Sequence, residues 1–173
     1  FAYVSNCNNE NYNRLGVMEE VAKYIPVDIF SNPCKGANVV QPPCPMQARG
    51  SNPDCEREKH KAYRFFLSFE NTLCMDYITE MFWDRLKSSS YFIPIALGGL
   101  SVEDYTSVAP PNSFIHAYNF TSVRQLGEYL KHLMENKEEY NSYHQWRYEY
   151  QINTNRNLSA CDVCKMAHEK PYL

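Results

Sequence analysis

Residues 63–86 read YRFFLSFENTLCMDYITEMFWDRL and contain the transition that decides the fold. Residues 63–69 form a nearly continuous aromatic and apolar run, which is typical of a strand buried on both faces. Residues 76–87 place Ile78, Phe82 and Leu86 at helical spacing on one face. Polar Glu70 and Asn71 lie between the two segments. A buried strand, a polar turn and a helix predict an α/β unit whose turn faces a ligand.

The rest of the chain repeats this alternation of strand and helix. We therefore predict an α/β fold, a Rossmann-like parallel sheet flanked by helices, with residues 63–69 as a buried central strand. Residues 31–60 are rich in Pro, Cys and Gly without periodicity, and a long irregular loop is expected there. One domain should span residues 1–160, and residues 161–173 should form a cysteine-containing tail. The remaining strands are expected at 2–4, 27–30, 92–97 and 113–116, and the helices at 14–24, 122–136 and 138–148.

Composition and net charge argue against some classes of function. The chain has 173 residues and a formal charge of -3, so nothing favours binding to nucleic acid or to an anionic membrane. No apolar run reaches membrane-spanning length. The first residues, FAYVS, look like the middle of a strand, which indicates a fragment whose N-terminal part is missing.

Seven cysteines and two glycosylation sequons, at Asn119 and Asn157, favour an oxidising secretory compartment. Reduced thiols and chance sequons are the alternative. Cys7 and Cys74 each follow a strand at the same edge of the expected sheet, so we predict that they pair. A further link is expected within the loop, from Cys34, Cys44 or Cys55.

Two strand-to-helix turns form the candidate site. Ser5 and Asn6 follow the first strand, and Arg14 opens the next helix. The chain has neither of the two common glycine-rich phosphate loops, so an anion would be bound by Arg14 and helix N-termini. Glu80 could accept both hydroxyls of a ribose. Capping of turns and helices is the competing interpretation of these polar residues.

The segment YRFFLSFENTLCMDYITEMFW closely resembles the signature of the α-1,3-fucosyltransferases, a GDP-fucose-dependent family with the GT-B fold. The segments VSNCN, VDIF, PIALGG, APPNSFIHAYNF and CDVCKMAH also resemble parts of that family in the same order. The resemblance covers nearly the whole chain and is weakest in residues 31–60. It is most similar to invertebrate or core-type members, and it implies the C-terminal, donor-binding half of the enzyme.

The resemblance implies a role for each matching residue. Arg14 would face the diphosphate and Glu80 the ribose. The family normally has Lys where this chain has Met81, which predicts weakened donor binding or an inactive enzyme. The residues implied to contact GDP-fucose are Ser5, Asn6, Arg14, Phe66, Asn71, Tyr77 and Glu80.

The resemblance also sets expectations for the whole protein. The general base and the contacts to a glycan or glycoprotein acceptor would lie in the absent N-terminal half, so no catalytic residue is assigned here. No metal or other cofactor is expected. The full-length protein would be membrane-anchored in the Golgi lumen.

Alternatives stay open for the tail and for function. Cys161, Cys164 and His168 have spacing that permits a zinc site, with Cys55 or His60 as fourth ligand, or a redox pair. The resemblance implies disulfides to the N-terminal half instead. Besides a donor domain, the chain could be a catalytically weakened or dead relative that binds a nucleotide sugar or a partner. It could also be a small zinc-stapled interaction domain.

Overall fold

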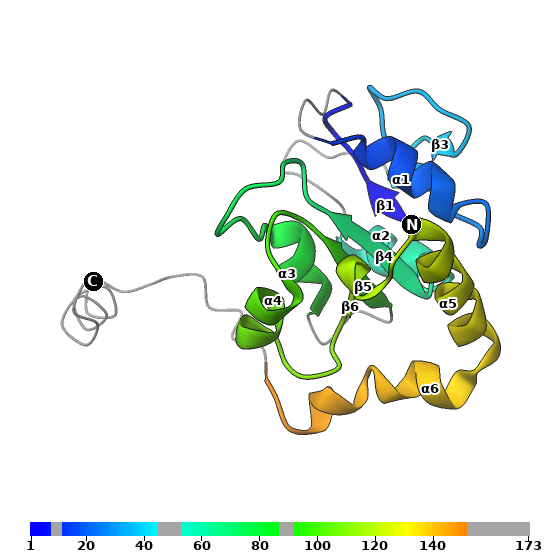
Figure 1. Ribbon diagram of the computed structural model, residues 1–173. Coiled ribbons are helices and arrows are strands. Elements are labelled where there is room, and N and C mark those ends of the chain that lie inside the picture. Colours follow the sequence, from blue (N-terminus) through cyan, green and yellow to red (C-terminus); the bar gives the residue numbers. More distant parts are fainter. Residues whose placement is uncertain (8–11, 45–52, 87–91, 152–173) are drawn as a thin grey trace, which may run out of the picture.

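The computed structural model describes residues 1–7, 12–44, 53–86 and 92–151 (Figure 1). The expected tail at 161–173, with Cys161 and Cys164, and the sequon at Asn157 lie outside these ranges. Within them the chain alternates strands and helices, as an α/β fold requires.

Six parallel strands form the framework of the described part of the chain. Two three-stranded sheets have the orders β1-β2-β3 and β4-β5-β6. Backbone hydrogen bonds join β1 to β4: the Leu67 nitrogen donates to the Phe1 carbonyl at 2.8 Å, and the Phe1 nitrogen to the Phe65 carbonyl at 2.9 Å. The combined order is β3-β2-β1-β4-β5-β6, with a topological switch point between β1 and β4. The strands are β1 (Ala2–Tyr3), β2 (Ile29–Phe30), β3 (Val39–Val40), β4 (Phe65–Phe69), β5 (Ile93–Leu97) and β6 (Ile115–His116).

The buried central strand predicted at 63–69 is confirmed for residues 65–69, whereas Tyr63 is half-buried, Arg64 is exposed, and both precede the strand. Every residue of β4 is buried, and β4 lies between β1 and β5. Its neighbour β5 is also buried throughout and includes Pro94, which is paired with Phe66. Both strands are covered on both faces, and this explains their nearly unbroken apolar sequences.

Helices cover the two faces of the sheet separately (Figure 1). On one face α1 (Arg14–Val21) and α5 (Val123–Glu135) pack against β4 and β5. Gly127 permits the close approach of α5 to the end of α1, because a Cβ there would lie 2.5 Å from a Tyr24 ring carbon. On the other face α3 (Glu80–Leu86) and α4 (Val102–Val108) surround a second core.

The amphipathic helix expected at 122–136 is confirmed as α5. The Ser122 hydroxyl accepts from the Gln125 nitrogen and caps its start. The helix expected at 138–148 is divided into α6 (Lys137–Ser142) and the 3-10 helix η2 (Gln145–Tyr148). Arg147 donates to the Leu86 carbonyl at 2.9 Å and docks this end of the chain onto α3.

Two expectations about elements need correction. The helix expected from Asp76 begins only at Glu80, since Asp76 has a left-handed φ of 56° and belongs to a turn. The loop expected at 31–60 contains β3 and α2 (Pro53–His60). The charged α2 has no apolar periodicity, and an ion pair between Asp54 and Arg57 supports it locally. The sequence reading also did not anticipate α4 or the short 3-10 helix η1 (Ala117–Asn119).

Candidate functional site

The candidate site lies where β1 and β4 end side by side. In open parallel sheets this switch point leaves a crevice, because the connections from the two strands leave toward opposite faces. The turn after β1 carries Ser5 and Asn6, and the turn after β4 carries Glu70 and Asn71. The fold thus brings together two segments that are more than sixty positions apart in sequence.

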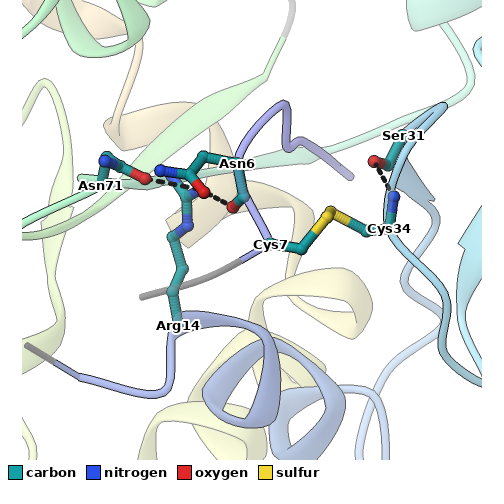
Figure 2. Close-up of a disulfide and its surroundings, with 6 residues drawn as sticks. All are labelled: Asn6, Cys7, Arg14, Ser31, Cys34 and Asn71. Carbon is teal, nitrogen blue, oxygen red and sulfur yellow. Dashed lines mark hydrogen bonds between the residues drawn. A yellow bond between two sulfur atoms is a disulfide. The ribbon is translucent and has the colours of Figure 1, made fainter. Parts of the chain in front are cut away.

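Arg14 joins these two turns (Figure 2). Its side chain enters from the first turn of α1 and is only 3% exposed. One terminal nitrogen donates to the Phe69 carbonyl at 3.2 Å. The other donates to the Asn6 carbonyl at 2.9 Å and to Asn71 Oδ1 at 3.2 Å. Arg14 therefore holds the ends of β1 and β4 in a fixed relation.

The electrostatics of Arg14 follow from its burial. Its three acceptors are neutral oxygens, and its Nε is buried with no hydrogen-bond partner in the described part of the chain. Burial lowers the pKa of Arg14, while nearby Tyr12, Glu70 and Tyr77 oppose this shift. An arginine pKa stays far above neutral, so the group places a positive charge beneath the two turns.

Glu70 fixes the start of α3. Its carboxylate is 1% exposed and accepts from the backbone nitrogen and from the hydroxyl of Thr79, each at 2.9 Å. Burial raises the pKa of Glu70, and the two bonds from Thr79 counteract that rise. The Tyr12 hydroxyl donates to the Glu70 carbonyl. Glu80 follows Thr79 directly, so this buried carboxylate sets the position of the exposed one.

The disulfides differ from the predicted pairing. Cys7 pairs with Cys34, with Cα atoms 5.4 Å apart (Figure 2), and Cys74 is free and exposed. Cys7 and Cys34 follow β1 and β2, which are adjacent strands, whereas Cys74 lies in the turn after β4 that packs against Gly99. The predicted second link is confirmed as Cys44–Cys55, and Cys55 is therefore unavailable as a zinc ligand.

A cavity of about 360 Å³ opens beside the Arg14 network. It lies at the carboxyl ends of β1 and β2, and α2 and α3 contribute to its wall. Ser5 and Glu80, both predicted to bind the donor, line it together with Met81 and Arg85. Met81 also packs against the aromatic cluster of Phe1, Phe30, Phe66 and Phe92.

The predicted residues thus fall into groups. Asn6, Arg14 and Asn71 form one hydrogen-bonded network, and Tyr77 acts electrostatically on Arg14. Ser5 and Glu80 belong to the cavity. Phe66 is fully buried, and its predicted contact with a donor stays a prediction.

The sequence reading missed two features of the site. Glu70 was considered for the turn, but its bonds to Thr79 were not anticipated. Arg85 was overlooked, although its position four residues after Met81 on a helix was a usable signal. The described residues contain no group of three or more His, Cys, Asp or Glu placed to hold a metal ion.

Two further expectations concern the surface. Asn119 is exposed in η1, as a glycosylation acceptor must be. Among the described residues no helix combines the length and apolar character needed to cross a bilayer.

Comparison with known proteins gives consistent matches. A sequence model described as glycosyltransferase family 10 (fucosyltransferase), C-terminal part, matches residues 1–173. An α-(1,3)-fucosyltransferase of Caenorhabditis elegans is 32% identical over 98% of this chain and 38% of its own length. A glycoprotein 3-α-L-fucosyltransferase A of Drosophila melanogaster is 36% identical over 99% of this chain and 31% of its own length. The chain thus spans about a third of these relatives.

Solved structures agree on the fold. A crystal structure of an α1,3-fucosyltransferase with GDP-fucose superposes with a TM-score of 0.63 at 22% identity, covering 98% of this chain and 46% of that one. A second crystal structure of an α1,3-fucosyltransferase, this one with GDP, gives a TM-score of 0.60 at 23% identity, over 91% of this chain and 40% of that one.

Proposed function

This chain belongs to glycosyltransferase family 10, the fucosyltransferases, and from that premise we propose that it is the donor-binding part of an inverting enzyme. In this proposal the enzyme moves fucose from GDP-fucose to a glycan acceptor. The observation that carries it is the junction of β1 and β4, where Arg14 links Asn6 and Asn71 beside a cavity lined by Glu80.

The chemistry of fucosyl transfer suits this arrangement. As the bond from fucose to GDP breaks, negative charge grows on the diphosphate. A fixed positive charge near that oxygen stabilises the transition state more than the ground state. Arg14 is already oriented by three hydrogen bonds and need not reorganise during the reaction. The exposed carboxylate of Glu80 is suited to accept from a ribose diol.

Other parts of the reaction belong to the whole protein. The relatives are much longer than this chain. We therefore propose that the acceptor contacts and the general base come from sequence outside these 173 residues. The same proposal includes transfer without a metal cofactor. It also includes a location in the Golgi lumen, with a membrane anchor elsewhere in the protein.

A weakened or dead relative is the second candidate function, and Met81 favours it. At this position a thioether packs against aromatic rings where the family resemblance implies a lysine. Such a protein would bind a nucleotide sugar or a partner without efficient transfer. Transfer assays on the full-length protein separate the two candidate functions. Binding of GDP-fucose without transfer favours a weakened or dead enzyme, and turnover excludes that second candidate.

Isothermal titration with GDP, guanosine and inorganic pyrophosphate tests the donor-site proposal. We expect GDP to bind, and Glu80→Gln to weaken GDP about tenfold with little effect on pyrophosphate, which has no ribose. Arg124→Met is the matched surface control, because Arg124 is exposed on α5 and pairs with Glu128. A folded protein that binds neither GDP nor guanosine would overturn the proposal. EDTA should leave GDP binding unchanged.

A further inference from the structure

The cavity beside the Arg14 network contains a cation that the sequence reading overlooked. Arg85 is the one Lys or Arg among the described residues that line it. Arg14 does not line the cavity and directs its terminal nitrogens at protein oxygens. Among the described residues, Arg85 is therefore the cation that faces a ligand in the cavity.

Aromatic rings hold Arg85 in place. Its guanidinium carbon lies 4.4 Å from the centroid of the Phe66 ring and 6.0 Å from that of the Tyr3 ring. Stacking of this kind orients the planar group and leaves its N–H edges available for other acceptors. Arg85 Nε is also buried and has no hydrogen-bond partner within the described ranges. The side chain is thus ordered before any ligand arrives.

Helix geometry connects Arg85 with Met81. The two residues are four positions apart in α3, so they lie on the same side of the helix one turn apart. Both line the same cavity. Arg85 therefore places a cation on the same helix face as the apolar thioether of Met81. Arg85 lies one turn further along α3, and its long side chain spans part of that distance.

Two carboxylates also line the cavity, together with the polar side chains of Ser5, Ser31 and Asn32. Glu80 lies at the start of α3 and Glu56 on α2, and both face the cavity that contains Arg85. Glu56 and Asp84 act electrostatically on Arg85 and oppose the effect of burial, which lowers its pKa. One guanidinium with two carboxylates suits a ligand that carries both an anion and several hydroxyl groups.

We propose that Arg85 supplies the direct cationic contact to the diphosphate of the nucleotide sugar, from one helical turn beyond Met81. This inference rests on the proposed function, since it names the residue that binds the donor's diphosphate in that site. Glu80 and Glu56 then face the hydroxyl groups of the same ligand. Arg14 holds the turns in position and contributes its charge from beneath.

Titration calorimetry on three variants tests the proposal. Arg85→Met removes the charge but keeps an unbranched apolar side chain against the rings. Arg85→Lys keeps the charge without the fork, and Met81→Lys/Arg85→Met moves the cation to position 81. The probes are GDP and guanosine, which differ only in the diphosphate. Thermal unfolding and Arg124→Met serve as controls for folding and for general charge effects.

We expect Arg85→Met to weaken GDP binding about 10- to 100-fold, while guanosine binding stays within about twofold. The salt dependence of GDP binding should become shallower, because one screened attraction is lost. Arg85→Lys should lose less, and the double variant should recover at least part of the affinity.

Other outcomes overturn the assignment in distinguishable ways. If Arg85→Met weakens GDP and guanosine equally, Arg85 only supports the aromatic wall. If a folded Arg85→Met binds GDP as the native protein does, Arg85 does not contact the diphosphate, and the proposed function still stands. If the native protein binds neither probe, the proposed function itself fails.

Discussion

The two halves of the sheet are built by different means. The half of β4, β5 and β6 contains two five-residue strands that are buried throughout. The half of β1, β2 and β3 has strands of two residues each, with β3 partly exposed. Disulfide Cys7–Cys34 links the segments after β1 and β2, and Cys44–Cys55 links the segment after β3 to α2. The candidate site lies at the seam between them. Apolar burial supports both halves, since Ala2, Ile29 and Phe30 are also buried, but the half of β4, β5 and β6 depends on it more, and the half of β1, β2 and β3 adds covalent links.

The largest expected effect comes from the apolar half. Phe69→Ala removes a fully buried ring from the end of β4 and should lower the free energy of unfolding by about 4 kcal/mol. Denaturant unfolding measures it, with the exposed Tyr148→Ala as control. A loss below about 1 kcal/mol would show that the buried strand is not the main support of this half.

The next largest effect concerns the disulfide in the half of β1, β2 and β3. Cys34→Ser removes the disulfide that links the segments after β1 and β2, whose cysteines are separated by 27 in sequence. The substitution should lower the free energy of unfolding by about 3 kcal/mol. It should also weaken GDP binding, since Cys7 adjoins Asn6. Cys74→Ser is the matched control, because Cys74 is free and exposed. If Cys74→Ser destabilises the protein as much as Cys34→Ser, the observed pairing is wrong.

Acid should destabilise both halves through buried histidines. Burial lowers the pKa of His60, beside β1, and of His116, in β6, to about 4 from the usual 6.5. The unfolded chain binds protons first as pH falls, so stability is complete above about 6.5 and is lost between about 6.5 and 4. Each histidine should contribute up to about 3 kcal/mol of this loss.

Unfolding measured across that pH range, on His60→Gln and His116→Gln, tests the assignment. Each substitution should flatten part of the pH dependence. An unchanged slope in both variants would contradict the buried, neutral state of these rings.

The smallest effect concerns the seam itself. Thr79→Val removes the hydroxyl that donates to Glu70 and leaves one carboxylate oxygen without that donor. It should cost about 1.5 kcal/mol and weaken GDP binding, because the start of α3 positions Glu80. Thr79→Ser keeps the hydroxyl and should behave nearly as the native protein. Equal effects of Val and Ser would exclude this hydrogen bond as the cause.

Local pattern was enough to predict part of this architecture. The apolar run before Glu70 predicted β4, and the spacing of Leu126, Leu130 and Leu133 predicted α5, because each pattern reflects the burial of one segment. The charged α2 gave no apolar signal and was missed. The motif residues also identified the family. They predicted that the turn with Asn6 and the turn with Asn71 belong to one site.

Tertiary structure alone decided which side chains meet. The sequence by itself determined an α/β fold, a polar switch point and the cysteine content of the loops. It did not determine that Cys7 pairs with Cys34, since that choice depends on β2 being the neighbour of β1. Nor did it show that Arg14 is bound to carbonyl oxygens while Arg85 faces the cavity. Both choices depend on strand order and helix orientation, which arise from contacts distant in sequence and leave no local periodicity to read.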